Sequence, residues 1–320
     1  MEELVKSEPI ISEDMKVGDV VVKMYKTANL ASGSNTDTSF AVFYPSTGKN
    51  LPVVLYQSGM GGSSSGHKYQ ASIIAADGYV VVLPDRDGDQ RGGYLNTFMF
   101  LMLASPIASV SADGSHLMLA LEYVKLATEK GSGSPISGMA DPSTIIAAGF
   151  SMGGNEAIHF AAKSPDVVKA AILISPSVMW FGTISFRISH KAMTEAARDL
   201  SIPTLWITSE KDMTAVATYK MANEIVKKPT LVTFKSSVLD LDTPTTKATT
   251  HYGPFLGVGR YIGMADHFSL GNEKNDVSTL AILPFMKNVL STGEAGDLGL
   301  PDDLIASSHS VHPVLGAIFS

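Results

Sequence analysis

One serine stands in a pattern typical of a catalytic nucleophile. Ser151 is the centre of the segment GFSMG (149–153), which fits G-x-S-x-G. The β-branched apolar run at 143–148 predicts a buried strand before it, and 155–165 predicts a helix after it. On such a sharp turn the serine hydroxyl is exposed, and glycines are needed where side chains would collide. We therefore expect Ser151 to be a nucleophile; the alternative is a small-residue helix start without chemistry.

A serine hydroxyl needs a base within hydrogen-bond reach and an acid that orients the base. In chains with this turn the order is serine, then acid, then histidine. His267 lies in a short loop before the last predicted helix and is the expected base, whereas His251, in a longer loop, is the alternative. The remaining histidines precede the serine, lie on its own helix, precede the expected acid or follow the last helix.

The expected acid is Asp212, which lies in the loop after the predicted strand 204–208. Its position also suits a purely structural role as the N-cap of a helix at 215–226. The alternative acids are carboxylates of nearby loops, namely Glu210, Asp240 and Asp242.

A serine nucleophile also requires two backbone N–H donors that stabilise the oxyanion. One should be Met152, the residue after the nucleophile. The other should come from the glycine-rich loop after the predicted strand 51–56, where Met60 is the expected donor. Gly59 and Gly61 would let this backbone approach the substrate closely.

Two apolar segments are candidates for a substrate pocket. The segment 95–110, which contains Phe98, is the most apolar stretch outside the predicted strands, and Trp180 stands in a second group at 179–181. Aromatic and methionine side chains adapt well to apolar ligands. The competing interpretation is that both segments fill ordinary core.

Strands and helices alternate along the chain, which predicts an α/β fold with a mostly parallel central sheet and helices on both faces. Expected strands are 19–25 and 39–44 as an antiparallel pair, then 51–56, 79–83, 143–148, 170–175, 204–208 and 231–234. Expected helices are 69–76, 114–127, 155–165, 190–200, 215–226 and 277–290. We expect Asp113 to cap the second of these, and Glu156 to complement the helix dipole after the nucleophile. The expected organisation is a leader at 1–16, a single domain at 17–290 and a peripheral tail at 291–320.

Composition excludes several classes of function. The 320 residues are 45% hydrophobic and carry a net charge of −7, which favours a globular protein and disfavours nucleic acid as a partner. Without cysteine there is no disulfide, thiolate metal site or cysteine nucleophile. The loop at 57–66 lacks the lysine of a nucleotide-binding loop, and DRDGD (85–89) lacks the spacing of a calcium loop and is interpreted as a turn. No cofactor or metal is expected.

The N-terminal residues have no apolar core, so we expect no signal peptide in this chain. The compartment stays open between the cytoplasm and a secreted protein whose signal has been removed. The apolar segment 95–110 is too short, and too interrupted by Pro106, to be a transmembrane segment. The oligomeric state is also open.

Residues 17–290 resemble the α/β-hydrolase superfamily, and within it the dienelactone-hydrolase-like branch that includes polyester hydrolases (bacterial cutinases) and chlorophyllases. GFSMGG (149–154) stands where polyester hydrolases have G-H-S-M-G-G, IPTLWITSEKD (202–212) is similar to the acid strand, and ADHF (265–268) to the histidine segment. The resemblance implies an α/β-hydrolase fold, a triad at Ser151, Asp212 and His267, and oxyanion donors at Met60 and Met152.

The chain also departs from that branch. Phe150 replaces the histidine before the serine, QSGM (57–60) replaces a loop that carries an aromatic residue, and dienelactone hydrolases use a cysteine. The expected function is a serine carboxylic-ester hydrolase that acts on an apolar or aromatic ester, small or polymeric, through an acyl-enzyme. The alternatives are a hydrolase-fold protein that binds a ligand, and an acyltransferase, with little hydrolytic turnover.

Overall fold

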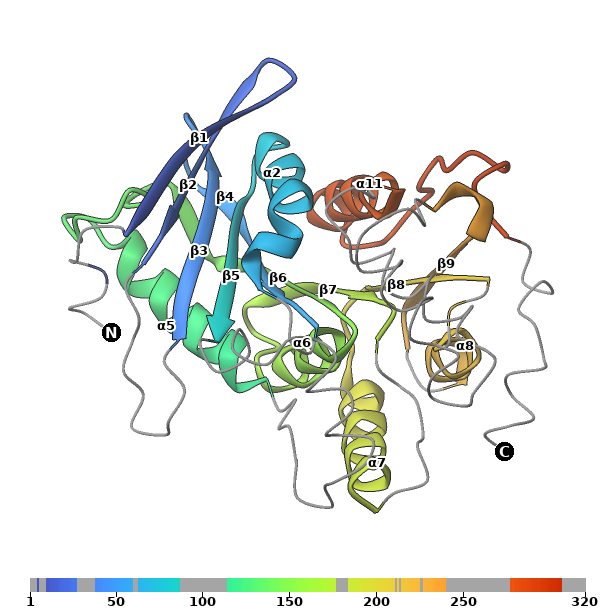
Figure 1. Cartoon of the computed structure of the whole chain (residues 1–320). Helices are drawn as coiled ribbons and strands as arrows, with labels where there is room; N and C mark the ends of the chain where they lie inside the picture. The colour runs from blue at the N-terminus through green and yellow to red at the C-terminus, as the bar shows by residue number, and fades with distance from the viewer. Residues whose placement is uncertain are drawn as a thin grey trace, which may run out of the picture.

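The structure is a computed structural model that describes residues 5, 10–27, 38–59, 63–86, 114–176, 184–210, 212, 214–224, 227–239 and 277–306. The described strands form one nine-stranded sheet with the order β1-β2-β3-β5-β4-β6-β7-β8-β9 (Figure 1). In chain order the strands are β1 (Ile11–Val17), β2 (Val20–Lys26), β3 (Thr38–Pro45), β4 (Leu51–Gln57), β5 (Val80–Arg86), β6 (Ala140–Phe150), β7 (Val168–Ile174), β8 (Thr204–Ser209) and β9 (Pro229–Phe234).

The sheet has two parts that differ in strand direction. From β5 through β4, β6, β7 and β8 to β9, each neighbouring pair is parallel. At the other edge β1, β2, β3 and β5 pair antiparallel. Parallel strands are covered on both faces and therefore read as continuous apolar runs, which is why the apolar segment 51–56 predicted a central strand correctly.

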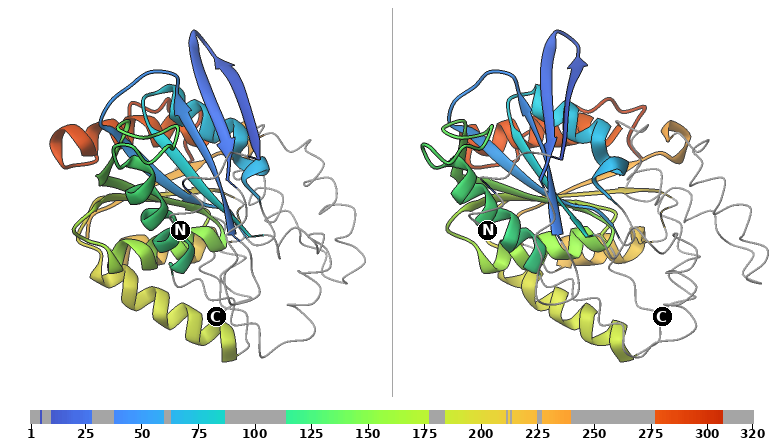
Figure 2. Two further views of the ribbon diagram at one scale, coloured as in Figure 1. Left: turned by 90° about the vertical axis from the view of Figure 1, so that its left-hand side faces the viewer. Right: turned by 60° about the vertical axis from the view of Figure 1, so that its left-hand side comes forward.

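Helices cover both faces of this sheet. The helices α2 (Lys68–Ala76) and α11 (Val277–Thr292) contribute side chains to one buried apolar cluster. The other cluster contains side chains of α5 (Ser115–Thr128), α6 (Met152–Lys163), α7 (Ile184–Asp199) and α8 (Ala215–Glu224). Figures 1 and 2 show these two layers on opposite sides of the strands. The predicted α/β architecture, with a mostly parallel sheet between helices, is confirmed.

The strand order reverses direction at β4. From β4 the chain passes through α2 to β5 on one side, and then through α5 to β6 on the other side. Right-handed crossovers require helices on opposite faces when the direction changes, and α2 and α5 lie on opposite faces. The carboxyl ends of β4 and β6 therefore border the crevice that such a reversal opens, where α/β sheets bind their ligands.

The segment assigned to a leader contains a strand. Residues 11–17 form β1, which pairs along its whole length with β2 across a turn in which Gly18 has a φ of 58°. The sequence ISEDMKV gave no strand signal because this edge strand is largely exposed and lacks the alternation of a half-buried strand. Figure 2 shows the β1–β2 hairpin extending beyond the rest of the sheet.

The start of α5 also differs from the expectation. Gly114, with a φ of 83°, occupies the N-cap position, and no side chain caps the helix there. A Cβ atom on Gly114 would lie 2.7 Å from the backbone nitrogen of Phe160 in α6, so only glycine fits this close helix contact. Asp113, the expected cap, lies outside the described residues.

The described part of the C-terminal tail packs along the last strand. The N–H of Ala306 donates to the Thr233 carbonyl at 2.8 Å, and the N–H of Lys235 donates to the Leu304 carbonyl at 2.9 Å. The tail thereby pairs with part of the exposed edge of β9, which would otherwise offer unpaired backbone groups to another chain.

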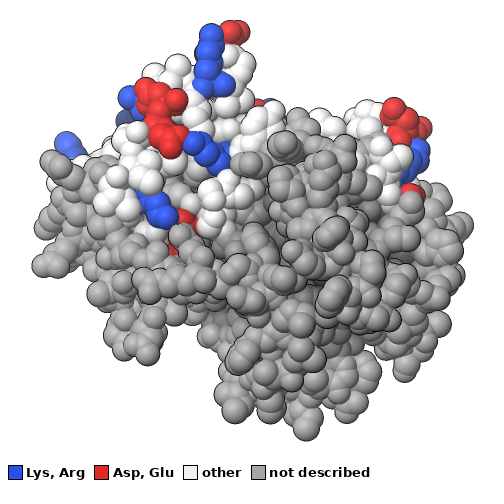
Figure 3. Space-filling model, viewed as in Figure 1, with Lys and Arg blue, Asp and Glu red and all other residues white. Residues whose placement is uncertain are grey.

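Charges on the described surface are mixed in sign. Figure 3 shows acidic and basic side chains interspersed over the β1–β2 hairpin at the upper left, and a second mixed group at the upper right. Lys68 and Glu13, for example, form an ion pair between α2 and β1. Within the described ranges, no helix has the length and apolar character needed to cross a bilayer.

Candidate active site

The candidate site residues lie where the parallel strands end. Gly59 follows β4, Asp85 stands near the end of β5, Ser151 follows β6, Ser175 follows β7 and Asp212 follows β8. Because these strands are parallel, their carboxyl ends share one edge of the sheet. This edge is the usual place for ligand sites in α/β sheets.

Ser151 has a strained backbone at the junction of β6 and α6. Its φ of 53° and ψ of −119° lie outside the regions that side chains other than glycine normally adopt. The N–H of Ser151 donates to the Ile174 carbonyl of β7 at 2.9 Å, and its carbonyl accepts from Gly154 at 3.0 Å. Such strain costs about 1–3 kcal/mol and persists only where the surroundings enforce it. The predicted strand, sharp turn and helix are all present.

The glycines on either side of Ser151 are required by backbone contacts. A Cβ atom on Gly149 would lie 2.1 Å from the carbonyl oxygen of Gly153. A Cβ atom on Gly153 would lie 2.0 Å from the carbonyl oxygen of Gln57, at the end of β4. The turn is therefore packed against its own helix and against the neighbouring strand.

The expected oxyanion donors are only partly described. Met152 is the first residue of α6, and the first N–H groups of a helix have no partner within the helix. The loop after β4 reaches the serine, since a Cβ atom on Gly59 would lie 3.1 Å from the Cβ of Ser151. Met60 and Gly61 lie outside the described residues.

Asp212 is buried, and its carboxylate accepts hydrogen bonds from Thr214 and Ser175. Its Oδ1 accepts from the N–H and the hydroxyl of Thr214, at 2.6 and 2.8 Å, and its Oδ2 accepts from the hydroxyl of Ser175. The side chain is 1% exposed. The contact with Thr214, just before α8, agrees with the structural interpretation of Asp212 as a capping residue. The contact with Ser175 does not serve α8, because it comes from the end of β7.

Ser151 and Asp212 lie on the same edge with one strand between them. They follow β6 and β8, which flank β7, so at the usual strand spacing about 10 Å separates the two strand ends. A side chain between them would be needed to connect them. His267, the expected base, lies outside the described residues, as do the alternative His251 and the pocket candidates Phe98 and Trp180.

Sequence patterns gave no signal for Ser175. It is buried, with a φ of 42°, and its N–H donates to the Ile207 carbonyl of β8 at 2.7 Å. A serine after a strand is too common to single out. Only the pairing of β7 with β8 brings its hydroxyl to Asp212.

Two interpretations of acidic residues were wrong. In the segment 85–89, interpreted as a turn, Asp85 is part of β5 and its carboxylate accepts hydrogen bonds from Ser64, whereas residues 87–89 lie outside the described residues. Glu156 is not in the first turn of α6. Its side chain is buried, and its Oε1 lies 3.0 Å from Nδ1 of His116 on α5. In the described part of the chain, no group of three or more His, Asp or Glu side chains could hold a metal ion.

His67 is buried beside the turn that carries Ser151. Its Nδ1 lies 3.2 Å from the Tyr56 hydroxyl, and its ring centroid lies 6.0 Å from that of Phe150. Burial lowers the pKa of His67 from 6.5 to about 4, and the nearby Asp85 carboxylate acts in the opposite direction. The imidazole is therefore neutral near pH 7.

We predict that Gly153→Ala destabilises the protein by roughly 2–4 kcal/mol, because the new methyl group meets the Gln57 carbonyl. Urea unfolding measures the change. Gly66→Ala is the matched control, since a Cβ atom there has no neighbour within 4 Å and its φ is not left-handed. Equal stability of the two variants would contradict the packing described for the turn.

The depressed pKa of His67 predicts an acid-sensitive stability. Above pH 6.5 its imidazole is neutral in both the folded and the unfolded chain, so this contribution is fully present. Between pH 6.5 and about 4 only the unfolded chain gains the proton, so the free energy of unfolding falls as the pH falls, by about 3 kcal/mol in total. Below about pH 4 the loss levels off.

Urea unfolding at several pH values should show a shallower acid dependence in His67→Phe than in the wild type. Tyr56→Phe, which keeps the buried histidine, should retain the wild-type slope. Identical slopes in wild type and His67→Phe would disprove the assignment.

No protein-family model matches the chain, and no curated protein matches its sequence significantly.

Proposed function

We propose that this protein is a serine carboxylic-ester hydrolase with an α/β-hydrolase fold, and that Ser151 is its nucleophile. The left-handed backbone of Ser151, with a φ of 53° between β6 and α6, carries the proposal. A strained residue that is not glycine, at the ligand-binding edge of an α/β sheet, is a feature of functional sites. The flanking positions, Gly149 and Gly153, have no room for a Cβ atom, and this supports the proposal further.

The reaction has two balanced halves. The Ser151 hydroxyl oxygen bonds to the ester carbonyl carbon, its proton passes to the base, and the carbonyl π electrons move onto oxygen. When the carbonyl re-forms, the alcohol leaves with the proton from the base. Water then attacks the acyl-enzyme in the same way, which releases the carboxylic acid and restores Ser151.

Stabilisation of the oxyanion is assigned to two backbone N–H groups. Met152 supplies one from the N-terminus of α6, where the helix dipole also favours negative charge. The second belongs to the loop after β4, with Met60 as the donor expected from the sequence. The closeness of Gly59 to the Ser151 side chain supports that loop. Each donor of this kind contributes about 10²–10³ in rate.

Asp212 is proposed as the acid that orients the base, His267. Its carboxylate is fixed by the Ser175 hydroxyl and by Thr214, so it can accept the imidazole N–H in one orientation. The order along the chain, Ser151, Asp212, His267, fits the order known for this turn. The preference for an apolar or aromatic ester rests on the composition of the segment 95–110.

We predict that Ser151→Ala lowers the kcat for p-nitrophenyl acetate by at least about a thousandfold and leaves the fold intact, because only binding and oxyanion stabilisation remain. A fluorophosphonate probe should label the wild type at Ser151 and not label the variant. Ser164→Ala, at the opposite end of α6, should retain both ester hydrolysis and labelling by the probe. A wild type that neither labels nor hydrolyses esters would favour the ligand-binding alternative.

We predict that His267→Ala is as severe as Ser151→Ala, whereas His251→Ala is mild, because members of a triad act as a unit. Steady-state kinetics with p-nitrophenyl acetate measures both. The rate should rise with pH through the titration of the base, since only neutral imidazole accepts the serine proton. A crippled His251→Ala variant beside an active His267→Ala variant would move the base to His251.

A further inference from the structure

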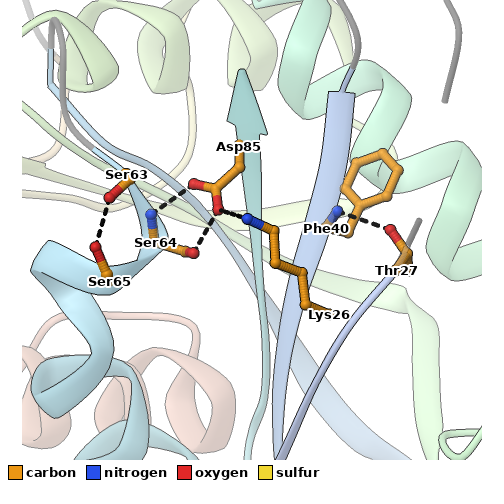
Figure 4. A network of polar contacts seen from close by, with 7 residues as sticks. All are labelled: Lys26, Thr27, Phe40, Ser63, Ser64, Ser65 and Asp85. Carbon is orange, nitrogen blue, oxygen red and sulfur yellow. Dashed lines mark hydrogen bonds and ion pairs between the residues drawn. The ribbon is translucent and has the colours of Figure 1, made fainter. Parts of the chain in front are cut away.

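Asp85, a buried acid near the end of β5, accepts hydrogen bonds from Ser64, the residue at which the loop after β4 ends. Asp85 is 2% exposed. Its Oδ1 accepts from the N–H of Ser64 and its Oδ2 accepts from the hydroxyl of Ser64, each at 2.5 Å. Figure 4 shows both oxygens facing the start of the short helix η1 (Ser64–His67). Ser64 is therefore fixed through its backbone and its side chain together.

The charge of Asp85 is balanced by a lysine from a distant strand. Lys26 Nζ, which is only partly exposed, lies 2.9 Å from Asp85 Oδ2. Lys26 belongs to β2, which is separated from β5 by β3, so its side chain passes β3 to reach the carboxylate (Figure 4). The N–H of Phe40 donates to the Thr27 hydroxyl at 2.9 Å and fastens the end of β2 to β3.

A contribution to folding stability alone does not explain the buried ion pair between Lys26 and Asp85. Replacing a buried ion pair by apolar residues of similar volume is often neutral or stabilising, because both charges lose their hydration. An apolar residue at position 85 could not accept the N–H and the hydroxyl of Ser64. The acid is therefore suited to fixing the position of Ser64.

The same loop is also fixed at its beginning. The Gln57 carbonyl oxygen abuts Gly153 in the first turn of α6, and Gly59 lies against the Ser151 side chain. Between Gly59 and Ser64 the sequence contains Gly61 and Gly62, and glycine is the residue type with the widest choice of backbone conformations. Residues 60–62 lie outside the described residues, and the described chain before and after them is held in place at Gly59 and Ser64.

We infer that Asp85 is a positioning residue for the oxyanion site, acting through Ser64 on the segment that carries the second N–H donor. The inference rests on the proposed esterase function. A donor must lie within about 2.7–3.1 Å of the developing oxyanion. A misplacement of about 1 Å can cost a hundredfold in rate, so loss of the Asp85–Ser64 contact should lower kcat and spare KM.

Asp85→Asn and Ser64→Ala test this inference. The side-chain amide of asparagine can accept one hydrogen bond from Ser64 through its oxygen, but its nitrogen cannot accept the second, and the charge opposite Lys26 is lost. Ser64→Ala removes only the hydroxyl and keeps the ion pair. Asp77→Asn is the matched control, because Asp77 follows α2 and pairs with Lys287 on the surface.

The substrates are p-nitrophenyl acetate and its thiono analogue, in which sulfur replaces the carbonyl oxygen. Sulfur accepts hydrogen bonds weakly, so the thiono ester gains little from oxyanion donors. Asp85→Asn should lower kcat for the oxygen ester by about 10–100-fold, with KM within about twofold, and should lower the ratio of ester to thiono-ester rates by a similar factor. Ser64→Ala should change both in the same direction, and Asp77→Asn should change neither.

An unaltered kcat in Asp85→Asn and Ser64→Ala would overturn the inference and leave the esterase proposal standing. An equal fall for both substrates, with the ratio unchanged, would also overturn it, because that is the signature of general damage to the fold. If Asp85→Asn fails to fold, Ser64→Ala decides the question by itself. A wild type without ester hydrolysis and without fluorophosphonate labelling would overturn the esterase proposal and this inference together.

Discussion

The structure depends on the close contact between the end of β4 and the first turn of α6. The Gln57 carbonyl abuts Gly153, and Gly149 abuts the backbone of Gly153, so three backbone segments meet without any intervening side chain. Because no atom can be added there, Ser151 is forced into a left-handed conformation between its strand and its helix. The position of the serine relative to the loop after β4 is then fixed by sterics and not by flexible side chains.

The sheet brings the residues of the candidate site together at one edge. Six neighbouring strands run parallel, so their carboxyl ends deliver Gly59, Asp85, Ser151, Ser175 and Asp212 to one edge. Two carboxylates there, Asp85 and Asp212, are almost fully buried, and each receives hydrogen bonds from a serine of another segment. A buried carboxylate with good donors is a rigid anchor, because each bond it makes is strong in a medium of low dielectric constant. We interpret the two acids as anchors of different parts of the same site.

Local patterns in the sequence predicted the elements well where burial is uniform. Apolar runs identified the parallel strands, and GFSMG between such a run and a helix identified the turn at Ser151, because its steric demands fall within a few residues. The edge strand β1 escaped detection because exposed strands do not need an apolar pattern. The N-cap of α5 was misassigned because Gly114 is required by its contact with the backbone of Phe160 in α6, which lies far from it along the chain.

The sequence by itself determined the class of fold, the strained turn at Ser151, and Asp212 and His267 as the expected partners of the serine in chain order. Only the tertiary structure decided which strands are neighbours, and with them the contacts between Ser175 and Asp212 and between Lys26, Ser64 and Asp85. Hydrophobic periodicity reports which faces of a segment are buried, and it carries no record of strand order. Hydrogen bonds between strand ends depend on that order, so they emerge only when the sheet is assembled.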